Sequence, residues 1–338
     1  MHFFVYEWTT GGGMVDEPGS LPATLVREGT TMIECLATDF ARIDGAHVTV
    51  LREPRVLRLV IPRCEIIDVQ SAASQRDEFE RLAAVADATI IIAPEFDGIL
   101  FKAARLAATC GGRLLSPARD FVRIAGDKHE TCRRLAAAGV RVPQGVVLEP
   151  DIKLPADFAY PAVLKPVDGA GSQDMQLVVG PYDEPRAYAW PRRLEPFIPG
   201  LAASVAFLCG PNGLIPLPPC KQRISTDGRL RYLGGELPLT SGLAERATTL
   251  GKQALAVLPA ATGYVGIDLI LGRDPHGAED FVIEVNPRLT TSYIGLRAAA
   301  QANLADAMVR VAVGELPEIV FSPRPLEFDV DGNVSFLP

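Results

Sequence analysis

With 338 residues, of which 48% are hydrophobic and 22% charged, the chain has the length and composition of a globular protein with two or three packing units. Its formal net charge of −8, with acidic and basic residues interspersed, argues against nucleic acid or an anionic membrane as a partner. No window holds 18 uninterrupted apolar residues, so we expect no membrane-spanning helix.

The six cysteines lie at positions 35, 64, 110, 132, 209 and 220, without a Cys-x-x-Cys spacing and without a paired histidine. We therefore expect buried thiols in a reducing compartment rather than disulfides or a zinc site. The first residues also lack a basic leader. These features predict a cytoplasmic protein.

Strand-like and helix-like segments alternate in residues 1–118, which predicts a parallel α/β domain. Ligands bind at strand ends in such sheets, so Glu95, just after the third strand, is a candidate for substrate binding. A solvated carboxylate is the simpler alternative. The expected elements are a strand at 2–6, a helix from about 21 to 40, a strand at 47–51, a helix at 77–88 and a strand at 89–93.

Three consecutive glycines, Gly11, Gly12 and Gly13, follow the first strand. They do not form Gly-x-Gly-x-x-Gly, so a nicotinamide-binding fold is disfavoured. Two interpretations remain. The glycines form either a tight turn without a function or a backbone surface that a small substrate approaches closely.

The pattern changes near residue 118. Ser116-Pro117 predicts the start of a short helix, and Asp127 predicts the N-cap of a second helix, with Glu130 completing a capping-box pattern. Lys128 is then a cation in the first turn, where it opposes the helix dipole unless an anion binds there. An exposed lysine without a function is the alternative.

Lys165 ends the next expected strand, at 160–165, and a glycine-rich loop at 168–172 closes on Ser172. A lysine beside such a loop can meet phosphate oxygens while the loop amides close over them. The loop is not a Walker A motif, because Gly-Lys-Ser/Thr is absent. A hairpin turn at Asp-Gly, with Lys165 snorkelling to solvent, is the alternative.

Asp268 and Glu284 lie in two apolar segments, 263–271 and 281–286, which the turn-like residues between them predict to pair as a hairpin. Glu284 and Asn286 share one face of their strand, because side chains in a strand repeat every two residues. Two carboxylates and an amide oxygen, without nearby His or Cys, are typical of a magnesium site. Solvated faces of two half-buried strands are the alternative.

Arg288 follows Pro287, which ends the second of these strands, so its guanidinium is expected beside the metal site. An extended segment at 216–225 presents Lys221 and Arg223 on one face, where they either hold phosphate oxygens or face solvent. The remaining expected elements are a strand at 201–208, helices at 242–258 and 295–314, and a polar tail after the proline-rich residues 317–325.

An ordered set of motifs over about residues 120–315 resembles the ATP-grasp ligases. The resemblance implies a mixed α/β and α+β architecture, namely an ATP-grasp fold preceded by an N-terminal parallel α/β (pre-ATP-grasp) domain. It divides the chain into 1–118, a central subdomain 119–195, a C-terminal subdomain 196–322 and a tail 323–338. The residues that carry the match are Lys128, Lys165, Glu195, Asp268, Glu284, Asn286 and Arg288.

The resemblance also implies roles for individual residues. ATP is held by Lys128, Lys165, Ser172, Glu195, Phe197 and Ile198; Mg²⁺, with Mn²⁺ as a substitute, is bound by Asp268, Glu284 and Asn286; Arg288, Lys221 and Arg223 act in catalysis. The segment from Arg193 to Gly200 resembles the family's hinge between the central and C-terminal subdomains. One departure concerns the ribose, because many relatives carry a carboxylate just after the glycine of this hinge, whereas residues 201–204 offer only a serine.

Within the family, Tyr6-Glu-x-Thr-Thr-Gly-Gly-Gly and the segment from Asn286 to Tyr293 most resemble members that join tyramine to the γ-carboxylate of L-glutamate in methanofuran biosynthesis. That resemblance implies a small-molecule carboxylic acid and an amine as partners, and a homodimer is possible. An ATP-grasp ligase with other substrates and an ATP-binding protein without turnover are the alternatives. The residues expected around the acceptor are Gly11, Gly12, Gly13, Glu95, Thr290, Thr291, Ser292 and Tyr293.

Overall fold

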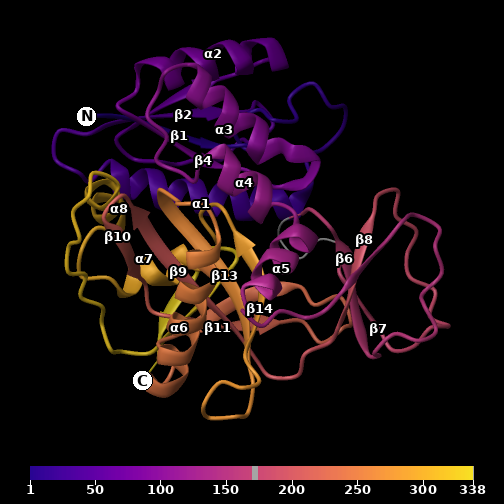
Figure 1. Ribbon diagram of the computed structural model, residues 1–338. Coiled ribbons are helices and arrows are strands. Elements are labelled where there is room, and N and C mark those ends of the chain that lie inside the picture. Colours follow the sequence, from indigo (N-terminus) through magenta and orange to yellow (C-terminus); the bar gives the residue numbers. More distant parts are fainter. Residues whose placement is uncertain (170–173, 338) are drawn as a thin grey trace.

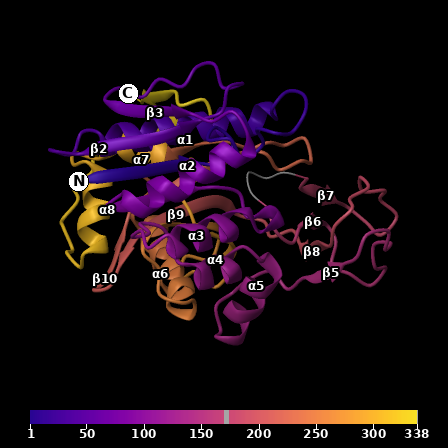
Figure 2. The ribbon, with the colours of Figure 1, turned by 90° about the horizontal axis from the view of Figure 1, so that it is seen from above.

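A computed structural model of the chain describes residues 1–169 and 174–337. In this part of the chain the strands form three sheets, of four, eight and four strands. Figures 1 and 2 show the four-stranded sheet of the first residues stacked on the large sheet, with the third sheet standing to one side as a smaller lobe.

The first unit is a parallel sheet with the strand order β3-β2-β1-β4. This confirms the parallel α/β domain expected at the N-terminus. The sheet gains β3 and the unit gains α3, which the sequence pattern did not predict, and α2 begins earlier than expected because Ser71 caps it. Its elements are β1 (His2–Glu7), α1 (Ala23–Phe40), β2 (His47–Arg52), β3 (Cys64–Asp68), α2 (Ala72–Val85), β4 (Ala88–Ile92), η1 (Phe96–Gly98) and α3 (Ile99–Thr109).

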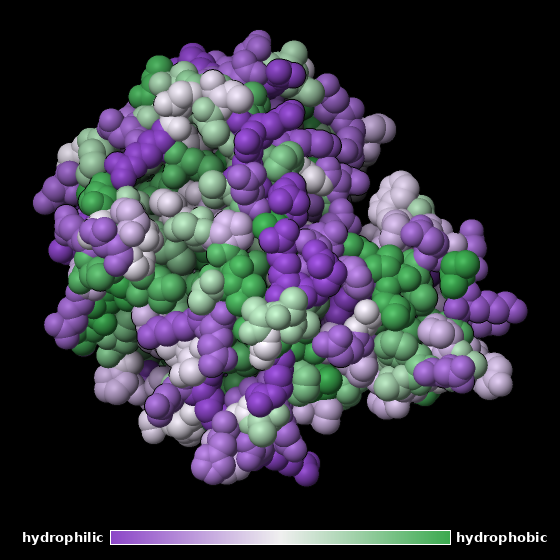
Figure 3. Space-filling model, in the orientation of Figure 1, coloured by the Kyte–Doolittle hydropathy of each residue, from purple (hydrophilic) through white to green (hydrophobic). Residues whose placement is uncertain are grey.

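Two helices lead to the smaller lobe, whose four strands pair antiparallel in the order β5-β8-β6-β7. This lobe has a small core and exposes apolar side chains such as Val146, Val147 and Trp190; Figure 3 shows an apolar area on its surface. The elements are α4 (Arg119–Ala125), α5 (Lys128–Ala137), β5 (Val146–Leu148), β6 (Ala162–Pro166), β7 (Gln176–Val178) and β8 (Arg192–Pro196).

The large sheet has the antiparallel order β14-β13-β9-β11-β12-β15-β16, with β10 paired to β9. Its elements are β9 (Leu201–Gly210), β10 (Gly213–Pro216), β11 (Cys220–Ile224), β12 (Tyr232–Leu237), α6 (Ser241–Val257), β13 (Gly263–Leu271), β14 (Phe281–Asn286), α7 (Tyr293–Ala299), α8 (Leu304–Ala312), β15 (Leu326–Asp329) and β16 (Val334–Phe336).

Helix α1 lies between the first sheet and the C-terminal unit (Figure 1). Its buried residues, among them Ile33 and Leu36, share one apolar core with strand β1 and with α7 and α8. On the opposite face of the large sheet, α6 packs over β9 and β13 and α5 packs over β14, around a second core. The first unit and the large sheet are therefore held together by buried apolar surface.

Two C-terminal expectations need correction. The single helix expected at 295–314 is two helices, because the Asn303 side chain caps α8 by accepting from the N–H groups of Ala305 and Asp306. Residues 326–336, expected as part of a polar tail, instead form two strands of the large sheet. Within residues 1–169 and 174–337, none of the helices is both long enough and apolar enough to cross a membrane.

The start of α5 follows the expected capping pattern only in part. The Asp127 carboxylate accepts the N–H of Glu130 at 2.8 Å, as an N-cap residue should. The reciprocal bond of a capping box is missing, because the Glu130 carboxylate instead pairs with Arg133 and Arg134 at 2.9 and 2.7 Å.

Candidate active site

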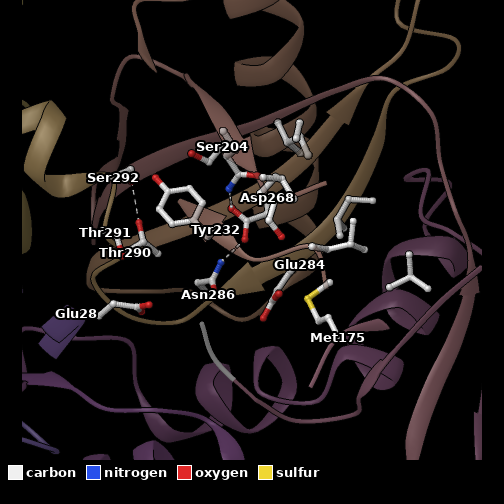
Figure 4. A pocket seen from close by; sticks show the side chains of 18 of the residues that line it. Glu28, Met175, Ser204, Tyr232, Asp268, Glu284, Asn286, Thr290, Thr291 and Ser292 are labelled. Atoms are coloured by element: carbon white, nitrogen blue, oxygen red, sulfur yellow. Dashed lines mark hydrogen bonds between the residues drawn. The ribbon is translucent and has the colours of Figure 1, made fainter. Parts of the chain in front are cut away.

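A cavity of about 510 Å³ lies where the three sheets meet. Its walls come from α1 and the ends of β1 and β4, from β6 to β8 with the hinge that follows, and from β9, β11, β13 and β14. Figure 4 looks into this cavity, with Asp268, Glu284 and Asn286 near its centre and Glu28 at its side. Every one of the three units thus contributes to a single concave surface.

The expected carboxylate pair forms as the sequence pattern predicts. Asp268 and Glu284 are direct neighbours across the antiparallel pair β13–β14, so their side chains leave the same face of the sheet. Asp268 accepts bonds from the side-chain amides of Gln222 at 2.7 Å and Asn286 at 3.1 Å. The alternative of two solvated strand faces is wrong, since these side chains line the cavity.

Burial, and then the charge of Glu284, raises the pKa of Asp268 to about 6. A carboxylate pair with such mutual repulsion is suited to a cation. The protein offers only a few ligand atoms here, and all of them are oxygens. This fits magnesium, because that ion takes much of its octahedral shell from phosphate and water. The residues that would hold it are those expected from the sequence, Asp268, Glu284 and Asn286.

Lys128 does not face solvent. Its Nζ lies 2.9 Å from the Glu284 carboxylate and donates to the Gly169 carbonyl at 2.7 Å, and its side chain is buried. Burial by itself lowers the pKa of Lys128, but Glu284 and Glu95 outweigh it and the pKa is raised. The lysine is therefore a fixed cation beside the carboxylate pair, and the alternative of an exposed lysine is wrong.

Lys165 is also buried, with 1% of its surface exposed, so it does not snorkel to solvent. Its Nζ lies 2.5 Å from the Glu195 carboxylate, whose other oxygen accepts from Arg193 Nε at 2.8 Å. The three residues come from β6 and β8, in which Lys165 pairs with Arg193. Glu195 lines the cavity, and these two cations hold its carboxylate in place.

Phe197 and Ile198 line the cavity directly after β8. Met175, Leu177 and Leu269 border the same region and make it apolar. The Phe197 N–H donates to Pro161 O at 2.9 Å and is therefore not available to a base. An apolar slot beside a hinge backbone fits a planar ring, and the adenine contact stays a prediction.

Arg288 and Glu95 connect the first unit to the end of β14. Arg288 Nε lies 2.9 Å from one Glu95 oxygen, and both side chains are buried. Burial by itself lowers the pKa of Arg288, but Glu95 outweighs it and the pKa is raised. Glu95 is therefore not the solvated carboxylate of the simpler alternative. Arg288 lines the cavity and Glu95 lies behind it, so a direct substrate contact of Glu95 stays a prediction.

Lys221 and Arg223 do not lie among the residues that line the cavity, which corrects the expectation for their position. The cavity is lined instead by their neighbours on β11, Gln222 and Ile224. On the other face of the strand, Lys221 pairs with Glu236 at 3.0 Å and Arg223 with Glu327 at 3.2 Å. The sequence pattern identified the alternation but assigned the wrong face to the site.

The glycine turn also lies outside the lining. Gly11 N donates to Glu7 O and Gly13 N to Trp8 O, both at 2.8 Å, and Gly12 has a φ of +95°. The turn positions Glu7 and Thr9, which do line the cavity. Its role is therefore to shape this corner, in agreement with the interpretation as a tight turn.

Thr290, Thr291 and Ser292 line the cavity as a strip of hydroxyl groups after β14 (Figure 4). The Tyr264 hydroxyl holds Thr290 and Ser292 from behind, at 3.1 and 3.0 Å. Tyr293 turns away, and its hydroxyl donates to Asp39 at 2.9 Å. Ser172 lies outside the described residues.

The sequence pattern did not identify Glu28 or Gln222 as site residues. Glu28 belongs to a face of α1 that reaches the cavity, and Gln222 holds Asp268. Gln222 follows from the alternation on β11, since it lies opposite the basic pair. Glu28 could not be identified from the helical period, because the face of α1 that carries it meets a cavity formed by residues far away in the sequence.

Comparisons with known proteins agree with this architecture. The family model described as an ATP-grasp domain matches residues 125–292, and the one described as a pre ATP-grasp 3 domain matches residues 46–121. The tyramine–L-glutamate ligase of Methanocaldococcus jannaschii is 23% identical over 96% of this chain and 93% of its own length. The enzyme of the same name from Methanocaldococcus fervens is 23% identical, over 96% and 98%.

Among solved structures, a protein of the ATP-grasp superfamily from Archaeoglobus fulgidus superposes with a TM-score of 0.72 and 22% identity. The match covers 97% of this chain and 92% of that one. This likeness shows the fold and confirms the expected ATP-grasp architecture with its preceding domain.

Proposed function

This chain belongs to the ATP-grasp family, and we propose that it is an ATP-dependent ligase that forms an amide from a carboxylic acid and an amine. One observation carries the proposal. The residues that line a single cavity include the hinge from Glu195 to Ile198, the carboxylate pair of Asp268 and Glu284, and parts of the first unit. One cavity thus offers binding groups for a nucleotide, for a transferred phosphoryl group and for an acceptor.

In the proposed reaction, a substrate carboxylate oxygen attacks the γ-phosphorus of ATP, and the bond to ADP breaks to give an acyl phosphate. The nitrogen of the amine, as the free base, then attacks the acyl carbon, phosphate leaves, and the nitrogen loses one proton to give the amide. The protein's part is to hold the reactants and offset charge. Magnesium bound by Asp268, Glu284 and Asn286 would neutralise phosphate oxygens.

Arg288 has the geometry for a catalytic role. It is held by Glu95 on one side, and its Nη1 donates to the Leu289 carbonyl at 3.1 Å, so its guanidinium is preorganised at the cavity wall. A fixed guanidinium can donate two parallel hydrogen bonds to a phosphate or a carboxylate without reorganising. Lys128 and Lys165, two further buried cations of the site, are each paired with a carboxylate in this structure.

For the substrates we propose L-glutamate, through its γ-carboxylate, and tyramine. The two tyramine–L-glutamate ligases that match nearly the full chain support this choice. The cavity is consistent with it, because the hydroxyl strip Thr290 to Ser292 offers polar partners and the first unit offers an apolar wall. Work on a different amino acid or amine is the alternative within the same family.

The test is ADP and phosphate release over a panel of acids and amines with ATP and Mg²⁺. We expect release to require both an acid and an amine and to be fastest with L-glutamate and tyramine. Phenethylamine lacks the phenol hydroxyl of tyramine. If that hydroxyl has a buried protein partner, phenethylamine should be a much poorer substrate, because the partner is left unpaired. No release with glutamate and tyramine, alongside rapid release with another pair, would contradict the substrates but not the ligase.

A further inference from the structure

The wall of the cavity formed by α1 has an unusual composition. Four residues one or two turns apart, Leu25, Glu28, Gly29 and Met32, line the cavity at the spacing of one helix face. The end of β4, residues 92–94, adds further apolar groups to the same wall. The first unit therefore presents an apolar surface that carries one acidic side chain on α1.

Glu28 differs from the other glutamates at the site. Glu284 is paired with Lys128 and Glu95 with Arg288. The Glu28 carboxylate makes no hydrogen bond or ion pair within residues 1–169 and 174–337, although the residue is only partly exposed. Burial raises its pKa, and the nearby charge of Arg288 lowers it less. A half-buried carboxylate without a partner favours a cationic ligand.

A second acidic side chain, Glu7, lies on the same wall, and burial raises its pKa. Glu7 accepts the N–H groups of Thr9 and Thr10 at 3.1 and 2.6 Å, which fixes it at the end of β1. Gly29 makes room for it, since a Cβ at that position would lie 2.6 Å from the Glu7 carboxyl group. Glu7 and Glu28 thus border the same corner of the cavity, and no lysine or arginine of α1 lines it.

We propose that Glu28 binds the ammonium group of the amine substrate, with Leu25, Met32 and the end of β4 enclosing the apolar body attached to it. The inference rests on the proposed ligase function and names the acceptor subsite within it. Figure 4 shows the Glu28 carboxyl group turned toward the side of Asn286 and Thr290, so an amine held there lies in the same cavity as the carboxylate pair.

An α-amino acid also carries an ammonium group, but this wall suits it less. Its carboxylates would lie among the acidic groups Glu7 and Glu28, whereas the guanidinium of Arg288 and the hydroxyl groups Thr290 to Ser292 offer it better partners. An arylalkylamine has one cation and one apolar body, which are the two features that the α1 wall matches.

The test compares Glu28→Gln with the wild type and with Glu34→Gln, a matched change on the same helix outside the cavity lining. For Glu28→Gln we expect the KM for tyramine to rise about tenfold or more, which is the loss of a charged contact. The KM values for ATP and glutamate should stay within about twofold. Hydroxylamine, which is uncharged at neutral pH, should give hydroxamate at the wild-type rate.

Three results would overturn the assignment: an unchanged KM for tyramine, a raised KM for glutamate instead, or an equal loss with hydroxylamine. A second variant tests the apolar part. Leu25→Ala should reduce the preference for tyramine over methylamine, and an unchanged preference would contradict the enclosed body. If the wild type forms neither amide nor hydroxamate, the proposed function fails, yet calorimetric binding of tyramine still decides the site, being weaker in Glu28→Gln if the assignment holds.

Discussion

Asp268 combines a functional position with a cost in stability. Its pKa is about 6 instead of 3.8, so its contribution is most favourable below the unfolded value and is lost as the pH rises through the folded one. We expect Asp268→Asn to stabilise the ligand-free protein at pH 8, by up to about 3 kcal/mol for a shift of this size, and to have little effect near pH 4. Thermal unfolding at the two pH values measures this, and an equal effect at both would contradict the raised pKa.

Glu284 is expected to matter for turnover rather than for folding. Glu284→Gln keeps the size of the side chain and removes the charge that a bound magnesium and Lys128 share. The loss of one ligand should lower kcat by about a thousandfold, equivalent to roughly 4 kcal/mol. Glu318→Gln, an exposed change, is the control. Near-normal kcat in a folded Glu284→Gln variant would rule out this metal position.

At the scale of elements, we expect nucleotide binding and phosphoryl transfer to depend on different strands, β6 and β14. Lys165, on β6, is expected to act on nucleotide binding, so Lys165→Met should weaken ATP binding in calorimetry by about tenfold or more. Arg288, at the end of β14, is expected to act during transfer, so Arg288→Ala should mainly lower kcat. Lys153→Met, at an exposed position, is the control. Equal effects of both changes on ATP binding would contradict these roles.

The elements also show where sequence patterns suffice. The hairpin β13–β14 was predictable, because alternation determines which side chains share a face and only the pairing of these two adjacent strands had to be assumed. The predicted positions of Lys221 and Arg223 were wrong, because alternation shows that the two side chains share a face of β11 but not whether that face meets the cavity. The split between α7 and α8 depends on a single cap at Asn303, which a continuous apolar period conceals.

Contacts between distant segments were beyond the sequence pattern. The pairing of Glu95 with Arg288 and the face of α1 that carries Glu28 both depend on how the first unit docks on the large sheet. Neither of these two features can be read from the pattern of a single helix or strand. Each motif of the site could be assigned a chemistry in isolation, but its partner could not be named from the sequence.

At the scale of the whole molecule, a buried cluster ties the first unit to the C-terminal unit. The Asp39 carboxylate at the end of α1 accepts from the Tyr293 hydroxyl at 2.9 Å and from Arg297 Nε at 2.8 Å. Hydrogen bonding to Asp39 and its charge raise the pKa of Arg297, despite the opposing effect of burial. Because α1 shares an apolar core with β1, α7 and α8, we expect the two units to unfold together.

Asp39→Ala tests this coupling, because it leaves the largely buried Arg297 without a partner. We expect a loss of about 3 kcal/mol in the free energy of unfolding, against little change for Asp44→Ala at an exposed position on the same unit. Trp8 fluorescence in a Trp190→Phe background reports the first unit, and hydrogen exchange of β13 peptides reports the large sheet. Within each protein the two signals should be lost at one urea concentration, and that concentration should be lower in Asp39→Ala than in the wild type. Two separate transitions in the wild type would show that the buried cluster does not make one cooperative unit, and the cavity walls would then move independently.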